Sequence, residues 1–185
     1  MSEPVDVVVV VGSLRKASLN LKIAKTLSLL APKSLRLEIV PIGDLALYNE
    51  ELDSAPPEIY RTFRERVGRA KAVLFVTPEY NRSVPGVLKN AIDVGSRPYG
   101  KSVWKGKPAA VISASPGALG GFGANHHLRQ SLVFLDMPVL QAPEAYLGNV
   151  GDWFDANDAI TNEKSKQFLQ RIIDAFAAWI ERVAQ

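Results

Sequence analysis

Small polar and basic residues lie directly after the first apolar run of this sequence. Residues 5–12 read VDVVVVVG, and four residues with phosphate-binding side chains follow: Ser13, Arg15, Ser18 and Asn20. Hydroxyl and amide groups donate hydrogen bonds to phosphate oxygens, and a guanidinium adds a planar pair of charged donors. An amphipathic helical pattern begins at Leu21, so the free N–H groups of a helix N-terminus would face the same anion. The pattern predicts a cradle for a compact phosphate group.

The sequence leaves one other interpretation of this segment open and excludes two nucleotide-binding motifs. Ser18 or Asn20 alone would also serve as the N-cap of the helix, without any ligand. The segment lacks GxGxxG and GxxxxGK[ST], so neither a dinucleotide-binding turn nor a P-loop is expected.

Two further loops follow apolar runs and carry residues suited to a planar ring. Residues 78–86 read PEYNRSVPG: Pro78 restricts the backbone, Tyr80 offers a flat aromatic surface, and Glu79 and Asn81 offer polar groups. Residues 113–121 read SASPGALGG, and glycine allows a backbone to approach a ring closely. A phosphate cradle beside two such loops favours a site for flavin mononucleotide (FMN).

The elements that must position these loops alternate along the chain. Strands are expected at residues 5–11, 35–40, 72–77 and 107–115, with a short fifth strand from about Pro138. Helices are expected from residue 21 and at residues 59–69, 85–93, 124–135 and 163–183, while residues 41–57 form a long loop of the kind that tends to be functional. This alternation predicts one α/β domain over residues 1–185, with helices on both faces of a parallel sheet.

The order of the strands decides whether the three loops can meet. In a flavodoxin-like sheet of order 2-1-3-4-5, the loops after the first, third and fourth strands lie side by side where the connections reverse direction. We therefore expect a flavodoxin-like three-layer sandwich with the ligand at the carboxyl ends of these strands.

Composition excludes several other classes of protein. Hydrophobic residues make up 47% and charged residues 22% of the chain, as in ordinary globular proteins. The net charge of +3 is not concentrated in a basic run, so no nucleic-acid partner is expected. There is no cysteine, no apolar run that spans a bilayer and no signal-like start, so we expect a cytoplasmic protein without membrane association.

The segments GSLRKASLN, PEYNRSVPGVLKNAID and SASPGALGG resemble, in order and spacing, the three signature loops of the NADPH-dependent FMN reductase family. The resemblance extends over nearly the whole chain. It implies that the FMN phosphate is held by Ser13, Arg15, Ser18, Leu19 and Asn20. It also implies that the isoalloxazine is lined, mainly through backbone groups, by Pro78, Glu79, Tyr80 and Asn81, and that the fourth strand contributes Ser115 and Gly117.

The same resemblance implies an enzyme that passes a hydride from NADPH or NADH to FMN and two electrons onward to a quinone or another small oxidant. Both substrates would use one face of the flavin in turn, which predicts ping-pong kinetics, and neither a catalytic side chain nor a metal is required. The resemblance further implies a homodimer or a dimer of dimers. Many relatives carry tryptophan after KNAID, where this chain has Val94 and Gly95, and this difference lies in the helix expected at the subunit contact.

Two other functions use the same cofactor. A flavodoxin-type electron carrier binds FMN without using NAD(P)H, but such carriers are usually acidic, whereas this chain is basic. An FMN reductase that supplies reduced flavin to a partner oxygenase remains the other alternative.

The titratable residues outside these loops do not suggest a metal site. His126 and His127 are adjacent in an expected helix and so point in different directions. The aspartates at 152, 155 and 158 lack the glycine and closing glutamate of a calcium-binding loop.

Overall fold

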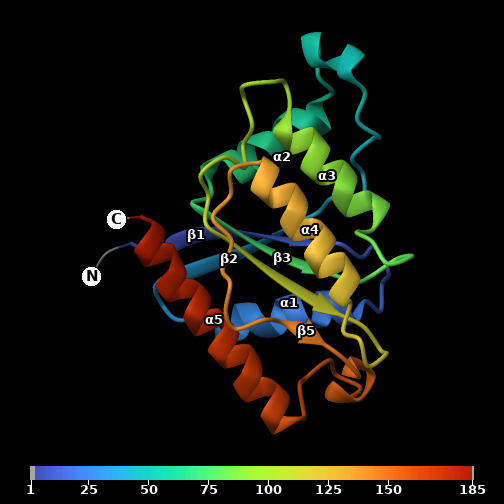
Figure 1. The fold of residues 1–185 in the computed structure, drawn as a ribbon, viewed down its shortest axis with the longest axis vertical. Helices are drawn as coiled ribbons and strands as arrows, with labels where there is room; N and C mark the ends of the chain where they lie inside the picture. Colours follow the sequence, from blue (N-terminus) through green and yellow to red (C-terminus); the bar gives the residue numbers. More distant parts are fainter. Residues whose placement is uncertain (1–2, 185) are drawn as a thin grey trace.

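The computed structural model describes residues 3–184 and contains a five-stranded parallel sheet. Its strands are β1 (Val5–Val11), β2 (Leu35–Val40), β3 (Ala72–Thr77), β4 (Ala109–Ala114) and β5 (Tyr146–Leu147). They are arranged in the order β2-β1-β3-β4-β5 (Figure 1). The predicted strand order is therefore confirmed.

Helices cover both faces of the sheet (Figure 1). Their bounds are α1 (Leu19–Leu30), α2 (Glu58–Arg69), α3 (Gly86–Ser96), α4 (Phe122–Phe134) and α5 (Glu163–Val183), with short 3₁₀ turns η1 (Glu50–Ser54) and η2 (Val150–Trp153). Residues of α1 and α5 form one hydrophobic core with the sheet, and residues of α2, α3 and α4 form the other. This is the predicted three-layer arrangement.

The valine run of β1 explains why the sheet has two cores. Val7 and Val9 belong to the core under α1 and α5, whereas Val8 and Val10 belong to the core under α2, α3 and α4. All four side chains are buried. A strand buried on both faces requires a continuous apolar run, and this one pairs in parallel with β2 and β3.

The fifth strand differs from the prediction. It was expected from about Pro138, but β5 consists of Tyr146–Leu147, and Val139 makes only an isolated bridge to Ala109. The intervening segment contains Pro143, and proline has no N–H group to donate to a neighbouring strand. The predicted start of this strand was therefore wrong, although its place at the edge beside β4 was right.

The long loop at residues 41–57 is held against α3 by one side chain. Asn90 accepts a hydrogen bond from the backbone N–H of Tyr48 at 2.8 Å and donates to the carbonyl groups of Leu45 at 3.1 Å and Ala46 at 2.8 Å. Because this amide is buried, its loss would leave several polar groups of the loop unpaired. In this structure, the loop packs on the helix that follows the PEYN segment.

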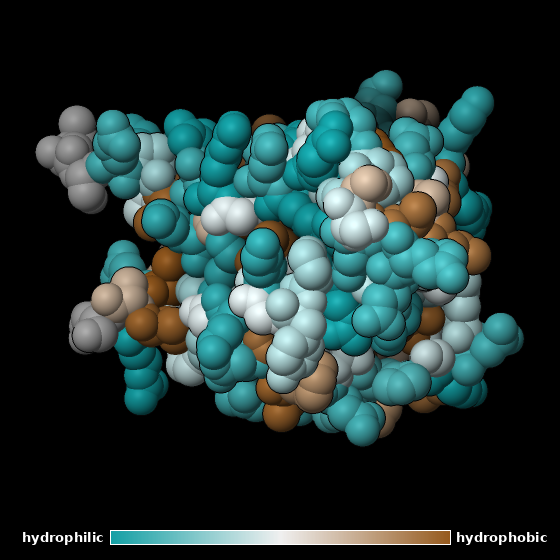
Figure 2. All heavy atoms as spheres, turned by 90° about the horizontal axis from the view of Figure 1, so that it is seen from above, coloured by the Kyte–Doolittle hydropathy of each residue, from teal (hydrophilic) through white to brown (hydrophobic). Residues whose placement is uncertain are grey.

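The surface is mostly polar on the face shown in Figure 2, where apolar residues form small separate groups. Among the helices of residues 3–184, none combines the length and the hydrophobicity needed to cross a membrane.

Val94 and Gly95, which follow the KNAID segment in α3, lie in the core of this chain. Val94 is fully buried, and Gly95 lies against the ring of Trp104, which is itself fully buried. The indole Nε1–H of Trp104 donates to the carbonyl of Ile92 at 2.9 Å, and the ring packs edge-on against Phe63 with centroids 6.0 Å apart. A tryptophan from a later segment thus packs against this end of α3.

Gly95→Ala should destabilise the protein. An added Cβ would lie 2.6 Å from three ring atoms of Trp104, which its packing and hydrogen bond hold in place. We expect the free energy of unfolding to fall by about 1–3 kcal/mol, measured by chemical denaturation. Gly86→Ala in the same helix is the control, because an added Cβ there meets nothing within 4 Å. Equal stabilities for the two variants would contradict the packing described for Trp104.

Candidate functional site

The three loops predicted to meet do so at the carboxyl ends of β1, β3 and β4. They surround a pocket of 240 Å³. Its lining residues are Ser13, Arg15, Ser18, Leu19, Asn20, Pro78, Glu79, Tyr80, Ala114, Ser115 and Pro116. Parallel pairing of β1 with β3, and of β3 with β4, brings these loops together.

The first loop ends in a capped helix with unused donors. Ser18 is the N-cap of α1, and its Oγ accepts a hydrogen bond from the N–H of Leu21 at 3.1 Å. Because the oxygen accepts, the hydroxyl proton of Ser18 is still available to a ligand. The first turn of α1 contains no acidic residue. The cap interpretation and the phosphate interpretation of Ser18 are therefore compatible.

Arg15 and Asn20 complete this end of the pocket. Arg15 is exposed and forms no ion pair with any part of the chain that the structure describes. Asn20 is buried; its Nδ2 donates to the carbonyl of Ala114 at 3.4 Å, while its Oδ1 has no hydrogen-bond partner among residues 3–184. A buried polar atom without a partner is unusual in a complete structure. These residues fit a cradle that a polar, anionic ligand completes.

The second loop is a tight hairpin. The backbones of Tyr80 and Ser83 exchange two hydrogen bonds of 3.0 Å, and between them Asn81 and Arg82 have φ values of 51° and 63°. Two consecutive residues with positive φ are typical of a type I′ turn. Asn81 does not line the pocket; its place in the turn explains why asparagine, which tolerates this conformation, occurs there. Tyr80 lines the pocket, and 49% of it is exposed.

The carboxylate of Glu79 is engaged by the chain itself. Its Oε2 accepts a hydrogen bond from the N–H of Ala124 at 3.0 Å, and its Oε1 pairs with Arg82 at 2.9 Å. The side chain is 12% exposed. With both oxygens engaged by other parts of the chain, the Glu79 carboxylate has a structural role in this loop.

The third loop lines the pocket only with its first residues. Ala114 and Pro116, which sequence reasoning missed, join Ser115 there, whereas Gly117 lies outside the lining and accepts a hydrogen bond from the hydroxyl of Ser115 at 2.9 Å. Both residues could have been predicted from the sequence, because they lie directly beside Ser115 in the SASPG segment.

The glycine pair of this loop serves the packing of the sheet edge. Gly120 and Gly121 have φ values of 59° and 73°. A Cβ on Gly120 would lie 2.5 Å from the backbone carbonyl carbon of Tyr146, so only glycine fits this conformation and this close approach.

A second groove adjoins the pocket and shares Arg15 and Tyr80 with it. This groove has a volume of 370 Å³ and is lined otherwise by Leu14, Pro85, Val87 and two glycines. Its apolar lining suits a planar ring rather than a charged group.

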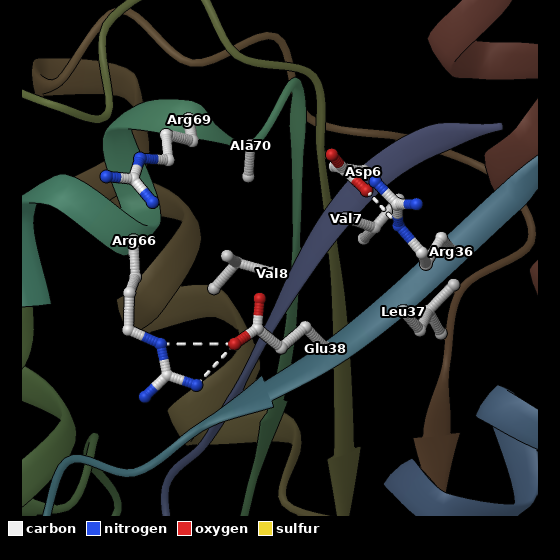
Figure 3. A pocket seen from close by; sticks show the side chains of 9 residues that line it. All are labelled: Asp6, Val7, Val8, Arg36, Leu37, Glu38, Arg66, Arg69 and Ala70. Carbon is white, nitrogen blue, oxygen red and sulfur yellow. Dashed lines mark hydrogen bonds and ion pairs between the residues drawn. The ribbon is translucent and has the colours of Figure 1, made fainter. Parts of the chain in front are cut away.

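A larger pocket of 550 Å³ lies at the amino ends of β1 and β2, beside the end of α2 (Figure 3). Two of its arginines are paired with carboxylates on the wall: Arg36 pairs with Asp6, and Arg66 pairs with Glu38. Carboxylates on the wall would oppose a phosphate, and the pocket lies at the opposite end of the sheet from the three loops. It is not the predicted site.

The two adjacent histidines of α4 contact different elements. His126 Nε2 lies 2.7 Å from the hydroxyl of Tyr146, and His127 Nδ1 lies 2.7 Å from the hydroxyl of Ser83. Burial, followed by the hydrogen bond to Glu144, raises the pKa of Tyr146 above its ordinary value. No group of three or more metal-ligating side chains occurs within residues 3–184.

Known proteins resemble this chain over nearly its whole length. A quinone reductase from Pseudomonas putida is 63% identical over 182 residues, which cover 98% of this chain and 97% of that protein. A 2-hydroxy-1,4-benzoquinone reductase from Burkholderia sp. is 46% identical over 174 residues, covering 94% and 95% of the two chains.

A solved structure shows the same fold. The flavoenzyme NAD(P)H:(acceptor) oxidoreductase FerB from Paracoccus denitrificans superposes with a TM-score of 0.90 at 46% identity, over 96% of this chain and 97% of that one. The flavodoxin-like fold predicted from the sequence is confirmed.

The family model of the NADPH-dependent FMN reductases matches residues 5–152, which contain all three loops of the site. The predicted resemblance and the predicted enzyme class are confirmed by this match and by the quinone reductases described above. The chain belongs to the NADPH-dependent FMN reductase family.

Proposed function

We propose that this protein is an FMN-dependent NAD(P)H oxidoreductase whose physiological electron acceptors are quinones. The observation that carries the proposal is the pocket where the three loops meet, because it joins unused phosphate donors to a partly exposed aromatic wall. The names of the quinone reductase relatives support quinones as the acceptor class.

In this proposal, the β1–α1 loop holds the phosphate of FMN. The hydroxyls of Ser13 and Ser18 and the free N–H groups at the start of α1, at Leu19 and Asn20, donate hydrogen bonds, and the Arg15 guanidinium balances the charge. A single phosphate uses all these donors, so the site suits FMN rather than a dinucleotide.

The remaining lining residues would hold the isoalloxazine ring. Pro78, Glu79 and Tyr80 offer the backbone of the hairpin, and Ser115 offers the end of β4. Bound FMN supplies the redox chemistry, accepting hydride from NAD(P)H and passing two electrons to the acceptor. The protein binds and orients the ring, and backbone N–H groups at its pyrimidine edge would stabilise negative charge there.

The groove beside Tyr80 provides a place for the substrates. Its apolar walls, Leu14, Pro85 and Val87, suit a nicotinamide or a quinone ring. A single groove of this size favours binding of the two substrates one after the other, and this is the basis of the ping-pong proposal. This use of NAD(P)H also distinguishes the enzyme from a flavodoxin-type carrier.

Arg15→Ala should weaken FMN binding. A charge-assisted hydrogen bond contributes about 1.5–3 kcal/mol, so the dissociation constant should rise about tenfold or more. Arg15→Lys should recover only part of the affinity, because lysine lacks the planar fork. Fluorescence titration measures the three constants, and Arg171→Ala, on α5, is the control. An unchanged dissociation constant for FMN in Arg15→Ala would show that Arg15 is an ordinary surface residue and does not bind the phosphate.

The proposed reaction predicts a spectral and a kinetic result. NADPH should bleach the flavin absorbance of the holoenzyme under anaerobic conditions, whereas an electron carrier should not respond. Double-reciprocal plots at several quinone concentrations should be parallel, and excess quinone should inhibit competitively against NADPH. Intersecting lines would indicate a ternary complex and would contradict a shared groove.

Tyr80→Ala should lower turnover more than it lowers FMN affinity, because the phosphate cradle is unchanged.

We also propose that two copies of this chain associate through α3 and α4, as a dimer or a dimer of dimers. A groove of 380 Å³ lies between these helices, lined in part by Asp93, His127 and Phe134. Phe134 is 82% exposed and Val133 is 74% exposed, so the end of α4 presents apolar surface that a second copy would cover.

Phe134→Asp should convert the assembly to monomers, because a carboxylate would have to enter an apolar contact. Light scattering at micromolar concentration measures the mass. Leu29→Asp is the control, since Leu29 is similarly exposed, at 87%, but lies on α1. A wild-type monomer, or the same mass for both variants, would contradict an interface on α3 and α4.

A further inference from the structure

The hairpin of residues 78–83 and the first turns of α4 are joined at several points. Glu79 Oε2 accepts from the N–H of Ala124, and the hydroxyl of Ser83 lies 2.7 Å from Nδ1 of His127. The two segments are separated by a whole strand and helix in the sequence. They carry, or directly follow, two of the three loops that line the pocket.

The start of α4 depends on this contact for its cap. The N-cap residue of α4 is Gly121, which has no side chain to accept hydrogen bonds from the first turn. An uncapped helix start leaves N–H groups without partners. Glu79, from a loop 45 residues earlier, supplies an acceptor and a negative charge at the positive end of the helix dipole.

Gly123 makes the close approach possible. A Cβ at this position would lie 2.9 Å from Oε2 of Glu79 and 3.0 Å from the carbonyl oxygen of Arg82. The glycine therefore allows both the carboxylate and the hairpin backbone to pack directly on the helix.

The same carboxylate holds the hairpin in a costly conformation. Arg82 adopts a left-handed backbone that is unfavourable for a long side chain, and its guanidinium pairs with Oε1 of Glu79 at 2.9 Å. One side chain thus contacts both the strained turn and the helix.

We propose that Glu79 is a positioning residue for the flavin ring: it fixes the hairpin against the start of α4 and so sets the backbone edge that faces the isoalloxazine. The inference rests on the proposed function, because it assumes that the pocket holds FMN. It assigns Glu79 no proton transfer, since both of its oxygens are engaged by the chain.

The test separates the ring end of the site from the phosphate end by using two ligands. FMN carries both parts, whereas lumiflavin is the ring without the ribityl phosphate. Glu79→Ala should raise the dissociation constants for both ligands by a similar factor, about tenfold. Arg15→Ala should raise only the constant for FMN. Glu79→Gln should recover only part of the affinity, because its amide oxygen still accepts from the N–H of Ala124 but the ion pair with Arg82 is lost.

A matched control removes a helix cap elsewhere. Asn162 caps α5 by accepting from the N–H of Ser165 at 3.0 Å. Asn162→Ala should lower stability while leaving both flavin affinities unchanged. The inference is overturned if Glu79→Ala leaves both dissociation constants unchanged or raises only the constant for FMN. It is also overturned if Asn162→Ala or Glu79→Gln raises both constants as much as Glu79→Ala does.

Gly123→Ala gives a second test if Glu79→Ala does not fold. The added methyl group separates the hairpin from α4 while Glu79 remains, so both ligands should again weaken by a similar factor. Gly151→Ala, where a Cβ meets nothing within 4 Å, is its control. Unchanged lumiflavin affinity in Gly123→Ala would overturn the inference. Wild-type protein that binds neither ligand would instead overturn the proposed function and this inference with it.

Discussion

Parallel pairing of β1 with both β2 and β3 is the interaction on which the site depends. It places β1 in the interior of the sheet, where Val7 to Val10 are buried on alternate faces in two separate cores. The pairing also reverses the direction of the connections, so the loops after β1, β3 and β4 meet at one edge. The phosphate donors and the hairpin belong to different parts of the sequence and become one pocket only through this order.

Helices α1 and α4 both begin at this edge, and their N-termini differ in which groups they face. The first turn of α1 has no acidic residue, and Arg15 beside it has no carboxylate partner among residues 3–184, so this positive end is available to an external anion. The start of α4 receives the carboxylate of Glu79 instead. The same kind of helix-end electrostatics therefore leaves a place for an anion at α1 and joins two loops at α4.

Side chains away from the pocket determine the position of the helix that follows the hairpin. Asn90 joins α3 to the long loop through three hydrogen bonds, and Trp104 packs against Gly95 at the other end of the same helix. The groove beside Tyr80 includes the start of α3 at Gly86 and Val87, so the packing of this helix affects the shape of the groove. Neither Asn90 nor Trp104 lines the pocket or the groove, yet both contribute to the position of α3.

The amino-acid sequence was sufficient to predict a parallel sheet, its strand order and most of the residues that line the pocket. The valine run, the helical periodicities and the three loop motifs are local patterns, and local patterns record burial, turn geometry and helix starts directly. The remaining features depend on contacts between residues that are distant in the sequence. No local pattern records contacts between residues that are far apart in the chain. Three such contacts are the hydrogen bond from α4 to Glu79, the packing of Gly120 against Tyr146, and the hydrogen bonds between Asn90 and the long loop. The short β5 strand has the same cause. Its length depends on where the chain can pair with β4 after Pro143, which has no N–H group to donate.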